Sequence, residues 1–235
     1  VLVNGEAVVP RATEPIKPVP DDHVDQTIEK LPPTLAAMVE FQRLTGCRPQ
    51  DVCQITTGAI ETSGKVWIYR PEKHKTAHHG KQRMVLIGPK AKAAIEPFLR
   101  TELDAFLFTP AQADRERREA RCADYAPPAN AAGDYRNWPS YQKRRQQAEA
   151  KAEPKRYRDR YTSTTYARAI AEACIAANIP HWSPNRLRHN AATRIRKEYG
   201  LDIAQVVLGH SGADVTQVYA EADLAKATKA IEAVG

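Results

Sequence analysis

No stretch of the sequence stays apolar for the roughly 20 residues that a membrane-spanning helix needs, and the first residues do not join a basic stretch to an apolar core. We therefore expect neither a membrane span nor a signal peptide. Cysteine is also scarce: the four residues form no CxxC pair, and Cys47 and Cys53 lie six positions apart, which suits a tetrahedral zinc site poorly. These absences favour reduced thiols in a cytoplasmic protein without a metal or another cofactor.

The sequence does have an excess of positive charge. It carries 35 lysines and arginines against 28 aspartates and glutamates, a formal net charge of +7. Five of that surplus fall between residues 111 and 160, where 13 basic residues stand against 8 acidic ones. A basic balance favours a polyanionic partner, because each phosphate contact releases condensed counterions. We expect this insertion, about 111–160, to be either a solvated charged surface or a basic arm along a DNA backbone.

Hydrophobic periodicity predicts a mostly helical chain. Residues 1–32, rich in proline and mixed charge, are expected to form an extended arm or linker. A helix from Pro33 is predicted to end at Gly46, and Arg48-Pro49 opens a second, short helix. Alternating β-rich residues at 65–70 and 83–87 predict a hairpin. Further helices are predicted at 90–102, 162–178, 183–199, 201–208, 214–220 and 224–233. The predicted class is mainly α with a small antiparallel β-sheet or hairpin, that is, α+β.

Three short stretches stand out by their order. They read LTGCRPQDV at 44–52, NRLRHNAAT at 185–193 and LGHSGADVTQVY at 208–219. This order resembles the tyrosine recombinase (phage integrase) family, whose motifs are TGxRxxE/D, HxLRHxxAT and LGHxxxxxTxxYxx. The nine-residue interval from His210 to Tyr219 is kept. The resemblance covers about 33–225 without the basic insertion, and it implies the tyrosine recombinase catalytic-domain fold and double-stranded DNA as the partner.

The resemblance assigns roles that suit the chemistry of these side chains. Tyr219 would attack the scissile phosphate and form a 3′-phosphotyrosyl intermediate, which divides one difficult step into two without metal or ATP. Arg48 and Arg188 would hold the non-bridging oxygens, since a guanidinium offers a planar fork that keeps its charge. Without a metal, such donors are what stabilises the pentavalent phosphorus.

Proton transfer falls to two further residues by the same resemblance. His210 would hydrogen-bond a non-bridging oxygen or relay the tyrosine proton. Lys75, on the tip of the predicted hairpin, would protonate the leaving 5′ oxygen. Lys73 and Lys81 lie on the same predicted tip and remain alternatives.

The second motif departs from the family at its first position, where Asn185 replaces the usual histidine. An asparagine amide can donate a hydrogen bond to a phosphate oxygen, but it cannot exchange a proton near neutral pH. We expect Asn185 to contact the phosphate; the alternative is a catalytically weakened, DNA-binding relative of the recombinases. Asp51 is expected to orient Arg48 or the neighbouring motifs.

The resemblance also sets expectations for domains and assembly. Residues 1–32 are too few for the N-terminal DNA-binding domain of full-length recombinases, 33–225 would form the catalytic domain, and 226–235 a C-terminal helix or tail. We expect a monomer that forms a tetramer on DNA, in a cytoplasmic, nucleoid-associated setting. The apolar face carrying Leu224, Ala227 and Ile231 would pack either on a neighbouring subunit or at home. An enzyme like the type IB topoisomerases, which relaxes DNA by similar chemistry, is the other alternative.

Overall fold

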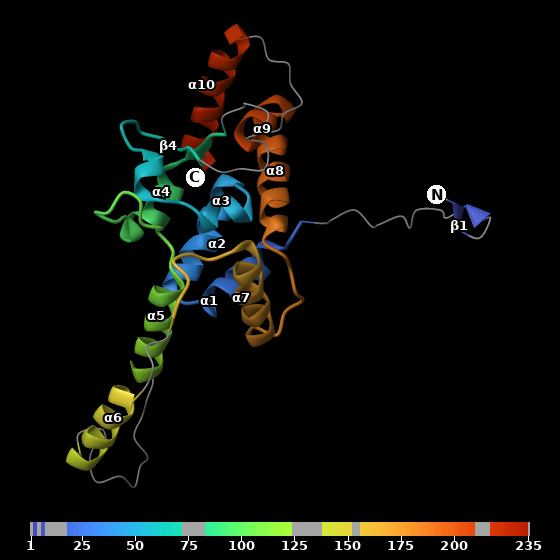
Figure 1. Cartoon of the computed structure of the whole chain (residues 1–235). Helices are drawn as coiled ribbons and strands as arrows, with labels where there is room; N and C mark the ends of the chain where they lie inside the picture. Colours follow the sequence, from blue (N-terminus) through green and yellow to red (C-terminus); the bar gives the residue numbers. More distant parts are fainter. Residues whose placement is uncertain are drawn as a thin grey trace.

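The computed structural model describes residues 2–3, 6–7, 18–71, 83–123, 138–151, 156–209 and 217–234. Helices dominate these residues, with one three-stranded antiparallel sheet and one two-stranded pair (Figure 1). The predicted class is confirmed. In chain order the elements are β1 (Leu2–Val3), β2 (Glu6–Ala7), α1 (Asp21–Glu29), α2 (Pro33–Thr45), α3 (Pro49–Cys53), η1 (Thr57–Ala59), β3 (Ile60–Glu61), β4 (Trp67–Tyr69), β5 (Val85–Ile87), α4 (Pro89–Ile95), η3 (Glu96–Phe98), α5 (Pro110–Ala123), α6 (Pro139–Lys151), α7 (Ser163–Ala176), α8 (Asn185–Tyr199), α9 (Leu201–Leu208) and α10 (Gln217–Val234).

Helix α2 is the central element of the core. It contacts α1, α3, α4, α5, α8 and β5, so side chains all around it are buried. Pro33 occupies its first turn, where a missing N–H costs no hydrogen bond. Gly46 ends it in the left-handed conformation, with φ of 64° and its N–H donating to the Gln42 carbonyl at 2.8 Å. The predicted start and end of this helix are confirmed.

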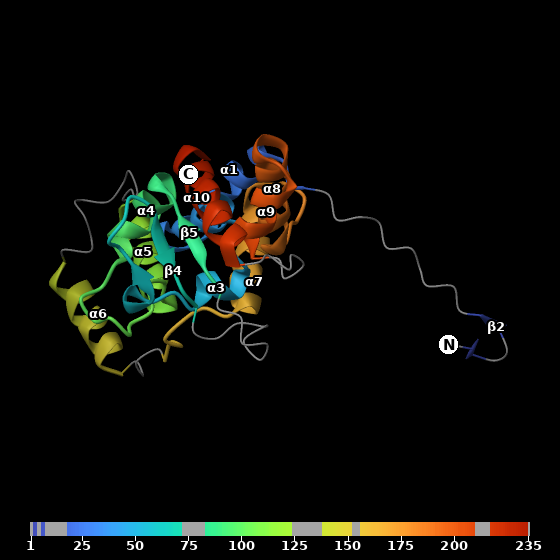
Figure 2. The ribbon, with the colours of Figure 1, turned by 90° about the horizontal axis from the view of Figure 1, so that it is seen from above.

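The small sheet has the strand order β3-β4-β5, with both pairs antiparallel. Trp67 lies opposite Ile87 and Tyr69 opposite Val85, so the predicted hairpin is confirmed and β3 adds a strand that we did not predict. All three residues of β5 are buried, because the strand contacts α2, α9 and α10; α10 lies beside it in Figure 2. Val85 and Ile87 accordingly join the main core, while Leu86 joins a second cluster around α9 and α10.

The first described helix corrects one expectation. Residues 21–29 form α1 inside the stretch that we expected to be extended, because Val24 and Thr27 lie on one face and are fully buried. Trp182 donates a hydrogen bond from Nε1 to Thr27 Oγ1 at 3.0 Å, which fixes α1 against the chain that follows α7. The prolines on both sides of this nine-residue helix concealed it in the sequence.

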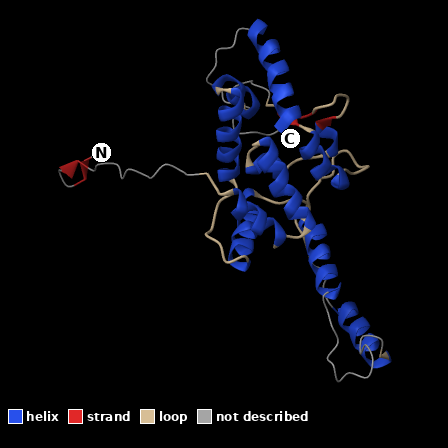
Figure 3. Ribbon diagram, turned by 180° about the vertical axis from the view of Figure 1, so that it is seen from behind, coloured by secondary structure: helices blue, strands red, loops and turns tan. Residues whose placement is uncertain are grey.

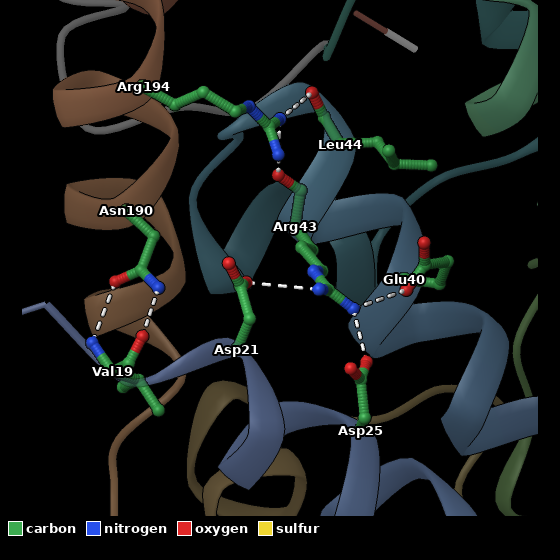
Figure 4. Close-up of polar contacts among 8 residues, drawn as sticks. All are labelled: Val19, Asp21, Asp25, Glu40, Arg43, Leu44, Asn190 and Arg194. Carbon is green, nitrogen blue, oxygen red and sulfur yellow. Dashed lines mark hydrogen bonds and ion pairs between the residues drawn. The ribbon is translucent and has the colours of Figure 1, made fainter.

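Polar contacts tie the residues at the start of α1 to α2 and α8 (Figure 4). The side chain of Asn190 in α8 accepts from the Val19 N–H at 2.8 Å and donates to the Val19 carbonyl at 2.6 Å. Arg43 of α2 pairs with Asp21 at 3.0 Å and with Asp25 at 2.6 Å. The entry to α1 is therefore attached to both α2 and α8.

The C-terminal part also differs from its prediction. The two helices predicted at 214–220 and 224–233 are wrong as separate elements within the described residues, because α10 runs unbroken from 217 to 234. No glycine or proline interrupts the sequence there. Ala227, Ala230 and Ile231 are buried in the cluster with α9 and β5, so this face packs on its own domain. The predicted helix at 90–102 likewise ends early, at α4, since Pro97 follows within two residues.

Helices α5 and α6 project away from the other helices (Figures 1 and 3). Glu116, in the middle of α5, bonds this helix to α2: its carboxylate accepts from Thr34 N at 2.8 Å and from Thr34 Oγ1 at 2.7 Å. This carboxylate caps the N-terminus of α2, where the helix dipole favours negative charge. Most described side chains of α6 are exposed. Nowhere in the described chain does a helix have the length and apolar character to cross a membrane.

Candidate active site

Three arginines from different parts of the chain lie close together with one carboxylate. Arg48 precedes α3, Arg83 precedes β5, and Arg188 lies in α8. Burial lowers the pKa of Arg188, the positive charges of Arg83 and Arg48 lower it further, and the negative charge of Asp51 raises it. Counted as ionised groups, these four side chains carry a net charge of +2. A cluster of this kind attracts an anion.

Arg48 is held by its backbone while its guanidinium has a free nitrogen. Its N–H donates to Asp51 Oδ2 at 3.0 Å, which closes the first turn of α3. The Nη1 atom is buried and has no hydrogen-bond partner among the described residues. Burial lowers the pKa of Arg48, and the charge of Arg83 lowers it further. A bound anion would satisfy the nitrogen and offset both effects.

Arg188 joins the three sequence motifs through their backbones. It donates from Nη1 to the Gly46 carbonyl at 2.8 Å and from Nη2 to the Leu208 carbonyl at 2.7 Å. Both acceptors lie at helix ends, where carbonyls lack partners within the helix. Burial lowers the pKa of Arg188 to about 10, with Arg83 and Arg48 contributing. The side chain is therefore still charged at pH 7.

A second arginine of α8, six residues after Arg188, makes the same kind of contact. Arg194 donates from Nη2 to the Arg43 carbonyl at 3.2 Å and to the Leu44 carbonyl at 3.5 Å (Figure 4). The C-terminal end of α2 is thus bonded to α8 at three carbonyls, those of Arg43, Leu44 and Gly46, just before Arg48. This arrangement fixes the first motif against the second.

Gly46 allows the three motifs to approach one another. A Cβ atom at this position would lie 2.7 Å from Leu208 Cδ2 and 2.8 Å from Ala191 Cβ, closer than real contacts allow. Glycine is therefore required here both by space and by its positive φ of 64°. The glycine places α2, α8 and the end of α9 in direct contact.

Arg83 is the site residue that the sequence did not lead us to. Its side chain is 6% exposed, and its Nε donates to Asp51 Oδ2 at 2.9 Å. Tyr69 on the neighbouring strand donates its hydroxyl to the Asp51 carbonyl at 3.0 Å. The one signal was a basic residue directly before the apolar run MVLI. A basic residue at the foot of a strand usually remains at the surface, so this signal is weak.

The remaining predicted residues are placed less completely. Asn185 is exposed at the first position of α8, one turn before Arg188 and on the same side of the helix. Tyr219 is the third residue of α10, and only its backbone is described. Lys75 and His210 lie outside the described residues, as do the alternatives Lys73 and Lys81.

The chain belongs to the phage integrase family, whose sequence model matches residues 22–226. The crystal structure of XerA recombinase is similar with a TM-score of 0.54 and 18% identity, covering 96% of this chain and 66% of that one. A crystal structure of the XerH site-specific recombinase, bound to its difH substrate in a pre-cleavage complex, has a TM-score of 0.46 and 12% identity, covering 94% of this chain and 58% of that one. Among curated proteins, none is matched by this sequence. The chain thus spans about three fifths to two thirds of these two recombinases, and the XerA similarity supports the catalytic-domain fold.

Proposed function

We propose that the protein is a site-specific tyrosine recombinase that cuts and rejoins double-stranded DNA through a covalent link to Tyr219. The observation that carries this proposal is the arginine cluster, in which half-buried Arg48 has a buried nitrogen without a partner among the described residues and buried Arg188 is fixed between the three motifs. A phosphodiester brings one negative charge into this cluster, and the charge on its non-bridging oxygens grows during attack. Fixed cations stabilise that change most in a site with little water.

In this mechanism the Tyr219 oxygen forms a bond to phosphorus while the bond from phosphorus to the 5′ oxygen breaks. The phenol proton passes to His210 or to solvent, and Lys75 donates a proton to the departing 5′ oxygen. Arg48 and Arg188 hold the non-bridging oxygens, and Asn185 adds an amide donor. Reversal by another 5′ hydroxyl restores the phosphodiester. The tyrosyl ester retains the bond energy, so no ATP is consumed.

The basic insertion is a second region of the molecule that we propose contacts DNA. Helix α6 exposes Lys143 and Arg144 together with neutral polar side chains, and α5 carries it away from the core (Figure 3). We assign α6 to the phosphate backbone flanking the cleavage point. Strand exchange further requires four subunits on two duplexes, so we propose a tetramer on DNA.

A suicide-substrate experiment tests the function. A duplex with the recombination site and a nick beside the cleavage point loses the short 5′-ended strand after cleavage, which traps the covalent intermediate. We expect a protein–DNA band on a denaturing gel, in the presence of EDTA, that is absent for Tyr219→Phe. A wild-type protein that binds the duplex but never forms this band would refute the recombinase.

One observation favours a second candidate function, the catalytically weakened DNA-binding relative. Asn185 stands, exposed, at the family's histidine position near the arginine cluster. Asn185→His separates the two: a cleavage rate unchanged or lower than wild type supports an active enzyme adapted to asparagine. Cleavage that appears only in the histidine variant supports the weakened relative.

A further inference from the structure

Among the described residues, Asp51 is the one carboxylate beside the three arginines, and its ion pair is with the guanidinium of Arg83. Its Oδ2 atom accepts from the backbone N–H of Arg48 at 3.0 Å and from Arg83 Nε at 2.9 Å. The side chain is 2% exposed, so it depends on these two donors and not on water. Within the described residues no ion pair joins Asp51 to the guanidinium of Arg48, although the two residues are three positions apart.

The guanidinium of Arg48 therefore remains available. Its Nη1 is buried without a partner in the described part of the chain, while the carboxylate nearest in sequence is bonded to Arg83. Arg188 is not available in the same way, because two of its N–H groups donate to carbonyls. Of the two arginines assigned to the phosphate, Arg48 is the one that a freed carboxylate would capture.

From this arrangement we infer that Arg83 is a positioning residue: its ion pair with Asp51 keeps that carboxylate from Arg48, whose guanidinium is then open to the scissile phosphate. The inference rests on the proposed recombinase function. Arg83 touches neither substrate nor nucleophile in this role. It acts through Asp51: the reaction depends on whether this carboxylate pairs with Arg83 or with Arg48.

Loss of Arg83 would favour an ion pair between Asp51 and the guanidinium of Arg48. Asp51 would stay buried with one donor fewer, and a buried carboxylate without a cation is strongly disfavoured. The guanidinium of Arg48 can supply that cation, but a guanidinium paired with Asp51 is lost to the phosphate. The slower cleavage expected from the loss of Arg83 should therefore disappear once Asp51 no longer carries a charge.

The test is a set of single-turnover cleavage rates at saturating DNA, on the nicked duplex, for wild type, Arg83→Gln, Asp51→Asn and the double variant. We expect Arg83→Gln to slow cleavage about 100-fold, comparable to the loss of one oxyanion donor. In the Asp51→Asn background, the loss of Arg83 should cost less than about 3-fold, a small change on the scale of that donor loss. A loss near 100-fold in both backgrounds would overturn the inference.

A second substrate separates positioning from a general defect. A methylphosphonate at the scissile position replaces one non-bridging oxygen by a methyl group, which removes the charge that Arg48 neutralises. The gap between wild type and Arg83→Gln should fall from about 100-fold to below about 10-fold on this substrate. An equal slowing on both substrates would indicate a merely structural role and refute the positioning of Arg48.

The thermal stability of the four proteins is measured as a control. All four proteins are melted by circular dichroism, and rates are taken at least 15 °C below the lowest midpoint, on the order of the shift that a few kcal/mol produces. If Arg83→Gln does not fold, a loss near 100-fold in the double variant relative to Asp51→Asn alone still overturns the inference, since neither of these variants leaves an unpaired buried carboxylate. A wild-type protein without a covalent band would instead fail the proposed function and not this inference.

Discussion

Replacing Gly46 by alanine should destabilise the protein more than a left-handed conformation alone explains. The backbone has φ of 64°, which costs an L-residue about 1–2 kcal/mol. The added Cβ would also lie 2.7 Å from Leu208 Cδ2 and 2.8 Å from Ala191 Cβ. Ala191 has no flexible end to move and Leu208 is buried, so overpacking adds about 1–3 kcal/mol. The total loss of unfolding free energy is about 2–5 kcal/mol.

Gly209→Ala is the matched control. Its φ of 62° is almost the same, but the nearest atom to an added Cβ is Arg83 Nη1 at an ordinary 3.6 Å. Urea unfolding followed by circular dichroism should therefore give a loss of about 1–2 kcal/mol for this variant, the conformational part alone. Equal losses for the two variants would refute the claim that the three motifs are in contact at Gly46. Cleavage should also fall in Gly46→Ala, because the Gly46 carbonyl accepts from Arg188.

Three further outcomes follow from described contacts. Asn190→Ala removes both bonds to the incoming chain at the start of α1 and should lower the unfolding free energy by about 1–3 kcal/mol; a urea midpoint equal to wild type would contradict this. Ellman's reagent at pH 8 should titrate one thiol in the native protein, the exposed Cys122, and four after unfolding. Burial raises the pKa of Cys47 and of Cys53 to about 12, so almost no thiolate forms there at pH 8. The protected thiols are Cys47, Cys53 and Cys174. Finally, Lys143→Gln with Arg144→Gln should reduce the slope of log K against log [salt] by about 0.9 for each lost phosphate contact, whereas an unchanged slope would mark α6 as a solvated surface.

Local signals predicted the elements whose ends depend on backbone chemistry. Pro33 and Gly46 bound α2 as expected, Pro49 opens α3, and the alternating residues before and after the hairpin tip form β4 and β5. Such signals act within a few residues of where they occur, so a sequence contains them in full. The fold class followed from them.

Other features depended on neighbours distant in the chain. Helix α1 has a proline on each side and a modest apolar face, and it became visible only with Trp182 and α7 packed against it. The local sequence pattern predicts two short helices, 214–220 and 224–233, where the structure has α10. In the structure no glycine or proline interrupts the helix, and β5 and α9 pack on its described buried residues Ala227, Ala230 and Ile231, so tertiary packing adds to local propensity in holding it together.

The sequence by itself determined the family motifs, the residue types that suit phosphate chemistry and the excess of positive charge. Residue identity and spacing along one chain are sufficient for these. The motifs already predicted that Arg48 and Arg188 meet, but only the tertiary structure decided that Arg83 joins them, because it comes from a third segment whose distance in space no local pattern records. It alone showed that Arg83 occupies the only carboxylate in that cluster among the described residues, at 2.9 Å. Burial makes that pairing consequential, since charges removed from water must be balanced by neighbours.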